Sequence, residues 1–158
     1  MFAEPPTDAE LLEQQARSAW ASIARRHSWT LWVRLSTATP VSLATMEKLV
    51  DASATQFRKD IPGSAILVGI HGDTDRLHSH ALIFIPRRFS NPFHPAGISV
   101  VGSSYEPWLA LWWPHGQVWA REYDPDRFQS SSPHGAAEYL ARDPGSVWQF
   151  GTAPLRKN

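Results

Sequence analysis

The sequence predicts an α+β fold, in which one central antiparallel sheet carries helices packed on one face. Two long segments have apolar residues at the spacing of an amphipathic helix. Two apolar runs are separated by a turn short enough for a hairpin, which pairs its strands antiparallel. The elements follow one another as strand, helix, strand, strand, helix, strand, after a first helix, and this order favours a sheet covered by helices.

The first predicted element is a helix over residues 7–26, followed by a strand over residues 28–36. Thr7 stands at the position of a helix cap, and acidic residues follow it in the first turns, where they complement the helix dipole. In the strand, apolar residues alternate with polar ones, which is typical of a half-buried strand. The apolar stripe predicted for the helix consists of Leu11, Leu12, Ala16, Ala19, Trp20 and Ile23.

A second helix is predicted over residues 42–60, with Ser42 as its cap. A hairpin follows, because the apolar run that ends at His71 is separated by a Gly-Asp-Thr-Asp turn from a second run. The remaining elements are a Pro-rich loop at 87–102, a short helical piece at 108–113, a strand at 117–123, a helix around Tyr139 and a last strand at 147–150.

Length and composition indicate a single domain over residues 1–158, long enough to bury a core without disulfides. The absence of cysteine excludes thiol nucleophiles, thiolate zinc fingers and thiol redox motifs. No segment is long and apolar enough to cross a membrane, and the first residues lack the features of a signal peptide. We therefore expect a cytoplasmic protein with no membrane partner.

His78 and His80 are the most informative residues of the chain. Residues i and i+2 of a strand point to the same face, so both imidazoles leave the sheet together and form half of a divalent-metal site. The hairpin predicts that His71 returns beside the pair as a third ligand, with Asp73 and Asp75 as further oxygen donors. The alternative is that the pair is ordinary polar surface.

Tyr139 lies on the predicted helix that Pro144-Gly145 ends. Arg142 and Asp143 follow it at i+3 and i+4, so the three side chains lie near one face of the helix. A tyrosine beside a cation and a carboxylate is a candidate nucleophile. The alternative is that its ring packs in the core while Arg142 and Asp143 are solvated.

Together, these segments resemble the HUH endonuclease superfamily, which includes rolling-circle replication initiators, plasmid relaxases and single-tyrosine transposases. The family's paired histidines match His78 and His80, and its helix-borne tyrosine, with a basic residue three positions later, matches Tyr139 and Arg142. Residues 113–124 also look like the region before the tyrosine helix of replication initiators. The resemblance covers about residues 28–151 and implies a ferredoxin-like or RRM-like domain with the paired-histidine strand in the middle of the sheet.

The sequence departs from the family pattern at three places. Ser79 stands between the histidines where a bulky apolar residue is usual, and Arg142 replaces the usual lysine, which keeps the charge but cannot readily transfer a proton. Many initiators have an acidic residue at the place of His71, whereas single-tyrosine transposases take their third ligand at the place of Asp143. Both residues remain candidate third ligands.

The resemblance implies metal-dependent nicking and joining of single-stranded DNA by Tyr139, through a covalent 5′-phosphotyrosine intermediate. A phenol has an unperturbed pKa of about 10, so its surroundings must favour the ionised form. A divalent metal would polarise the phosphate, and Arg142 would steady the phenolate or the phosphate. The family expectation is Mg²⁺ or Mn²⁺, although a three-histidine set by its softness suits Mn²⁺ or Zn²⁺ better.

The implied partners are single-stranded DNA or a DNA hairpin at an origin, with a separate helicase for unwinding. A net charge of zero argues against general nucleic-acid binding, so we expect the contacts to come from local clusters. The candidates for DNA binding are Arg87 and Arg88, and for base stacking Trp112, Trp113 and Trp119. Further dibasic pairs are Arg25-Arg26 and Arg156-Lys157.

Two other functions remain open. A zinc-dependent hydrolase would use the three histidines and an attacking water, and it would form no covalent adduct with DNA. A catalytically idle member of the same fold would bind single strands, or a replication partner, without cleaving them.

Overall fold

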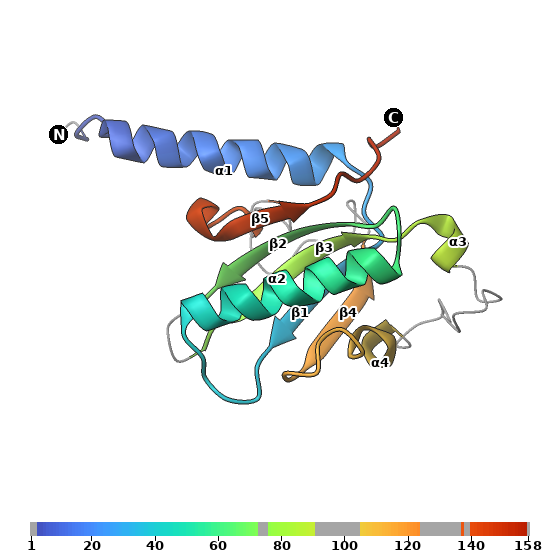
Figure 1. Ribbon diagram of the computed structural model, residues 1–158. Helices are drawn as coiled ribbons and strands as arrows, with labels where there is room; N and C mark the ends of the chain where they lie inside the picture. The colour runs from blue at the N-terminus through green and yellow to red at the C-terminus, as the bar shows by residue number, and fades with distance from the viewer. Residues whose placement is uncertain (1–2, 73–75, 91–104, 124–136, 138–139, 158) are drawn as a thin grey trace.

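The computed structural model describes residues 3–72, 76–90, 105–123, 137 and 140–157. Its elements are shown in Figure 1: α1 (Asp8–Arg26), β1 (Leu31–Ser36), α2 (Leu43–Asp60), β2 (Ala65–His71), β3 (His78–Phe84), α3 (Arg87–Ser90), α4 (Tyr105–Leu109), β4 (Val118–Glu122), the 3-10 turn η2 (Pro144–Ser146) and β5 (Val147–Phe150). The predicted elements are thus present with boundaries shifted by a few positions, except that most of the helix predicted around Tyr139 lies outside the described residues and that α3 occupies the start of the segment predicted as a loop.

The five strands form one open antiparallel sheet in the order β4-β1-β3-β2-β5. The α+β class with a central antiparallel sheet is therefore confirmed. The strand that carries His78 and His80 is β3, which lies in the middle of the sheet as expected.

Both long helices begin where the sequence places their caps. The Thr7 hydroxyl accepts the backbone N–H of Glu10, and the Glu10 carboxylate accepts the backbone N–H of Thr7, a reciprocal capping box. The Ser42 hydroxyl accepts the N–H of Thr45 at the start of α2. These bonds satisfy backbone donors that the first helical turn leaves without intrahelical partners.

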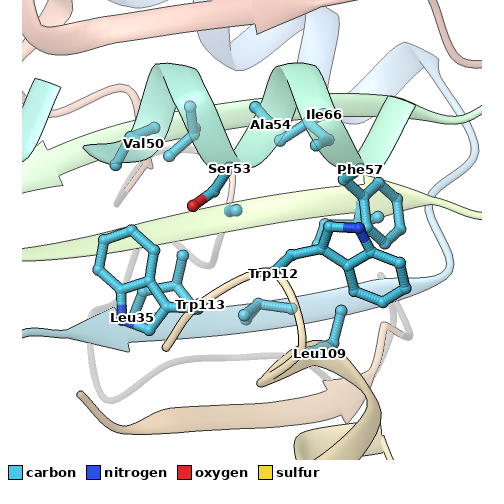
Figure 2. A pocket seen from close by; sticks show the side chains of 13 residues that line it. Leu35, Val50, Ser53, Ala54, Phe57, Ile66, Leu109, Trp112 and Trp113 are labelled. Atoms are coloured by element: carbon cyan, nitrogen blue, oxygen red, sulfur yellow. The ribbon is translucent and has the colours of Figure 1, made fainter. Parts of the chain in front are cut away.

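One face of the sheet is buried by α2 and by the segment around α4. From α2, Met46, Val50, Ala54 and Phe57 pack on alternate residues of the strands. Figure 2 shows a small apolar crevice of about 50 Å³ in this layer, between α2, the sheet and the two indoles of Trp112 and Trp113. We refer to this side of the sheet as the α2 face.

The opposite side, which we call the histidine face, has a second core. There Ala24 of α1, together with Ala137 and Leu140, packs on Trp32, Leu67 and Leu82. The prediction that helices cover only one face was therefore wrong. The central strands are apolar at both odd and even positions, so both faces require cover.

No residue of the predicted apolar stripe of α1 is fully buried: Ala16, Trp20 and Ile23 are half-buried, Ala19 is exposed, and the two buried residues of the helix lie outside the predicted stripe. Leu11 and Leu12 are 41% and 66% exposed, whereas Ala21 and Ala24 are buried. No helix among the described residues is long and apolar enough to span a bilayer.

Candidate functional site

The three predicted metal ligands lie together on the histidine face. In the β2–β3 register, His71 pairs with His78 and Gly69 pairs with His80. The distances between ring centres are 4.9 Å for His78–His80, 5.6 Å for His71–His80 and 6.1 Å for His71–His78. The hairpin thus brings His71 back beside the pair, as the sequence predicted.

The surroundings of all three imidazoles lower their pKa values and so favour the neutral form. Burial lowers the pKa of His71, and the Asp143 carboxylate opposes that shift. Burial also lowers the pKa of His78, and it lowers the pKa of His80 to about 3, with the charges of the other two histidines adding to the shift at His80. A neutral imidazole is the form that binds a metal, so these side chains need not lose a proton near neutral pH before they act as ligands.

Gly69 allows the chain around residue 140 to approach the histidines. A Cβ atom at this position would lie 2.8 Å from the Leu140 carbonyl oxygen and 3.0 Å from Nε2 of His71. On the other side of the segment, Nε of Arg17 in α1 donates to the Arg142 carbonyl at 2.9 Å. Residues 140–143 are therefore held between β2 and α1, next to His71.

Asp143 contacts His71 directly. The distance from Nδ1 of His71 to Oδ2 of Asp143 is 3.3 Å, so the ring donates this N–H to the carboxylate when Nδ1 carries the proton. A carboxylate on one ring nitrogen fixes the tautomer and leaves the other nitrogen, Nε2, to bind a metal. The two residues that the sequence offered as alternative third ligands are thus neighbours, with Asp143 placed to orient His71.

The donor set fits a divalent transition metal in chemistry and approximately in spacing. An ion bound about 2.1 Å from three ring nitrogens in tetrahedral or octahedral geometry would hold the ring centres roughly 4.6 to 5.3 Å apart. The observed range of 4.9 to 6.1 Å is slightly wider. In the part of the chain that the structure describes, no three His, Asp or Glu side chains already meet the geometry of a formed metal site. Metal binding would therefore require the rings of His71 and His78 to turn toward each other.

Two guanidinium groups border the histidines. Arg34 of β1 lies opposite His80 in the β1–β3 register, and its charge lowers the pKa of both His78 and His80. The charge of Arg142 lowers the pKa of His71 and His78. Sequence reasoning missed Arg34, although its alternation with the buried Leu31 and Val33 could have placed it on the histidine face.

Two surface hollows meet at Arg34 and Ser36. One, of about 360 Å³, reaches His80, and the other, of about 320 Å³, reaches His78. The first is lined by Trp32, Arg34, Ser36, His80, Gln117 and Trp119. Within it, the Trp32 ring stacks on His80 with a centre-to-centre distance of 5.1 Å and an interplanar angle of 17°. Of the predicted stacking residues, Trp119 is the one that lies here.

Trp112 and Trp113 do not lie at this site. Trp113 is 2% exposed, and its indole N–H donates to the Ser36 carbonyl, so it is a core residue. Trp112 packs against Phe57 on the α2 face and donates to Asp60. The prediction that these two rings stack on bases beside the histidines is therefore not supported by their positions. Both side chains instead line the apolar crevice of the α2 face.

Arg87 and Arg88 lie beyond the far end of β3. The strand separates them from His78 by about 20 Å or more, given the rise of an extended chain. The Arg88 guanidinium donates to the Pro62 carbonyl and lies over the Phe89 ring. These arginines are thus not part of the histidine site.

The predicted nucleophile, Tyr139, falls outside the described residues. On either side of it, Ala137 and Leu140 are buried in the second core, and the N–H of Ala141 donates to the Ala137 carbonyl at 3.1 Å. This i to i−4 bond is the pattern of an α-helix, which agrees with the helix predicted here.

Comparisons with protein-family models, with curated proteins and with solved structures each found no match to this chain. The likeness to HUH endonucleases therefore remains a prediction from the sequence.

Proposed function

We propose that this protein is a metal-dependent endonuclease that nicks and rejoins single-stranded DNA, as rolling-circle replication initiators do. The observation that carries the proposal is the grouping of His71, His78 and His80 on one sheet face, beside residues 140–143. In the proposed step, the Tyr139 oxygen forms a bond to phosphorus and the bond from phosphorus to the 3′ oxygen breaks. The products are a 5′-phosphotyrosine and a free 3′ hydroxyl, and the reverse reaction joins strands.

The histidines would hold Mn²⁺ or Mg²⁺, with Zn²⁺ as the alternative, and the bound ion would polarise a phosphate oxygen. With its proton on Nδ1, His71 donates to Asp143 and presents Nε2 to the ion. Arg34 and Arg142 place two permanent positive charges beside the histidines, and a guanidinium pairs with a phosphate through two parallel hydrogen bonds. These residues would bind and orient the scissile phosphate.

Single-stranded DNA is the substrate class that the histidine face supports best. Trp119 lies in the hollow beside His80, where an unpaired base can stack on an indole. The neighbouring Arg121 guanidinium lies 4.3 Å from the centre of the Trp119 ring. An aromatic ring with adjacent cations suits a strand whose bases are not paired.

A zinc-dependent hydrolase is the second candidate, and the His71–Asp143 pair favours it. Three imidazoles, one of them oriented by a carboxylate, are a donor set found in zinc enzymes in which a bound water attacks. The two functions differ in one product, because only attack by tyrosine leaves a covalent protein–DNA adduct. An idle fold would bind oligonucleotides and give no product at all.

The decisive experiment is to incubate the purified protein with single-stranded oligonucleotides and Mn²⁺, and to look for an adduct that survives denaturation. We expect wild type to form it and Tyr139→Phe to form none, because this change removes only the hydroxyl. Tyr105→Phe is the matched control, since Tyr105 lies in the core of the α2 face and should leave the adduct unchanged.

Metal titration by calorimetry tests the histidines separately. We expect His78→Ala and His80→Ala to abolish the binding of one divalent ion. Unchanged affinity in both variants would rule out the metal site. An adduct in Tyr139→Phe would refute the assignment of the nucleophile, and cleavage without any adduct would favour the hydrolase.

A further inference from the structure

The two dibasic pairs at opposite ends of the sequence meet in the fold. A single β-bridge joins His27 to Leu155, with backbone hydrogen bonds from Ser28 N–H to the Pro154 carbonyl and from Arg156 N–H to the Arg26 carbonyl, of 2.8 and 2.7 Å. The cations brought together by this bridge are all exposed: Arg25, Arg26, Arg156 and Lys157. A chain with zero net charge thus gathers four positive residues at one place.

A hollow of about 110 Å³ lies at this junction, lined by Ala24, Arg25, His27, Ser28, Trp29, Tyr123 and Arg156. The Trp29 and His27 parts of its wall are held in place, because the Trp29 indole donates to the Ala24 carbonyl at 2.9 Å and Nδ1 of His27 is hydrogen-bonded to the Ile23 carbonyl at 2.8 Å. The volume is about three to four times that of a water molecule in the liquid. This is room for one phosphate group in a hollow that both arginines line.

The hollow opens on the same side of the sheet as the histidines. Tyr123 and Trp119 both pack on the second core. Arg121 is two residues away from each of them along the extended chain, so its side chain lies on the same face of the sheet. The strand residues on the histidine face include two charged side chains besides histidine, Arg34 and Arg121, and no carboxylate among β1 to β5. The described strand residues of this face thus form a surface with two arginines, the Trp119 ring and no carboxylate between the hollow and His80.

The length of this surface is set by the strands. The N–H of Tyr123 bonds the Thr30 carbonyl, whereas Trp119 pairs with Arg34, and Ser36 pairs with His78. Thr30, next to the hollow, is therefore four to six strand residues away from Arg34 and Ser36, which lie opposite the two histidines. This separation is about 14 to 20 Å. A stacked single strand with a rise of about 3.4 Å covers that distance in about four to six nucleotides.

We propose that the hollow of Arg25 and Arg156 binds a backbone phosphate of the same DNA strand, about four to six nucleotides from the phosphate held at the histidines. This inference rests on the proposed function for the identity of the strand. The hollow anchors the strand and sets its direction across Trp119, while the histidine site carries the chemistry. Phosphate contacts of this kind position a strand without reading its sequence.

The test measures binding of fluorescent oligothymidines of 4 to 20 nucleotides by anisotropy, at several salt concentrations. The variant is Arg25→Gln with Arg156→Gln, and the matched control is Lys48→Gln with Lys59→Gln, which removes two exposed charges from α2. Because the hollow holds one phosphate, and each phosphate contact contributes about 0.7 to the salt slope on single strands, the slope should fall by roughly 0.7 in the first variant only. If the affinities at 1 M salt are equal, its affinity at 0.1 M should be about 5-fold lower.

Wild type should also gain affinity steeply as the oligonucleotide grows from about 4 to 8 nucleotides, and the arginine variant should not. Equal salt slopes and equal length dependence in wild type and the arginine variant would overturn the proposal. Adduct formation distinguishes this failure from that of the proposed function. If wild type forms the adduct while the arginine variant binds normally, the hollow is excluded and the nuclease stands. If no adduct forms but the variant loses affinity as expected, the hollow stands without the nuclease.

Discussion

The two faces of β3 show how one strand serves both stability and chemistry. Toward α2 it presents Ser79, Ala81 and Ile83, which are buried. Toward the other side it presents His78 and His80 and then Leu82, so this face is polar at one end and apolar at the other. The α2 face is a continuous core, whereas the histidine face is a core that stops where the imidazoles begin.

This difference shows where the fold carries an energetic cost. Folding moves the His80 imidazole out of water, and this desolvation, together with the charges of His78, His71 and Arg34, lowers its pKa to about 3. Buried titratable groups that face hollows are more frequent at functional sites than in ordinary cores. The α2 face shows the opposite pattern, because its small crevice is lined almost entirely by apolar side chains.

The largest expected difference between the faces comes from two tryptophans. Trp113→Ala should lower the free energy of unfolding by about 3 to 5 kcal/mol, because it removes a fully buried indole. Trp119→Ala should cost about 1 kcal/mol or less in stability, since the ring is only partly buried, and should weaken oligonucleotide binding by roughly 1 to 3 kcal/mol. Urea unfolding and anisotropy measure the two effects. The comparison between the faces fails if Trp119→Ala is the more destabilising change.

Gly69→Ala is expected to act next most strongly. The added Cβ would meet the Leu140 backbone oxygen at 2.8 Å, and a backbone atom cannot move aside cheaply, so we expect a loss of about 1 to 3 kcal/mol. Metal affinity should fall as well, because the same Cβ lies 3.0 Å from Nε2 of His71. Gly145→Ala is the matched control, since nothing lies within 4 Å of a Cβ added there. Wild-type stability and metal affinity in Gly69→Ala would show that the segment does not depend on this close approach.

Much of the fold could be predicted from the sequence because its signals are local. Thr7 and Ser42 cap helices at their predicted positions, and the run that ends at His71 folds back on β3. The covering of both sheet faces was not predicted. It depends on Trp32, Leu67 and Leu82, whose partners on α1 and around residue 140 are far away in the chain.

The site was predictable in part for the same reason. The places of His71, His78 and His80 follow from strand parity and one turn. The roles proposed for Arg34 and Asp143 depend on which strands pair and on where residues 140–143 dock, and neither is encoded in local spacing. For Trp112 and Trp113, nearness in sequence to the site was misleading, because the whole segment from α4 to Trp113 packs on the α2 face.

His71 and Asp143 provide a sharper test within the histidine face. Removing a carboxylate that orients a ligand typically lowers metal affinity ten- to hundredfold, so Asp143→Ala should lose about this much. His71→Ala removes the ligand itself and should lose at least as much. Asp143→Asn keeps an oxygen that accepts the Nδ1 proton and should retain most of the affinity. Calorimetric titration with Mn²⁺ measures all three, and an Asn variant as weak as the Ala variant would instead favour Asp143 as a direct ligand.

The smallest expected effect lies in the core of the α2 face, at Tyr105. Its hydroxyl is buried and has no hydrogen-bond partner among the described residues, so Tyr105→Phe should leave stability at pH 7 unchanged or raise it by up to about 1 kcal/mol.

The effect of Tyr105 on stability is different in the alkaline range. Burial, with a smaller contribution from Glu122, raises the pKa of Tyr105 to about 12. An unfolded tyrosine loses its proton near pH 10, so between about pH 10 and 12 the unfolded chain binds fewer protons than the folded one, and stability falls as pH rises. Tyr105→Phe lacks this contribution, and urea unfolding of both proteins from pH 8 to 11 should show stability falling more steeply in wild type. Parallel pH profiles would mean that the folded protein does not hold this phenol away from water, and that the core of the α2 face is more open at α4 than its packing indicates.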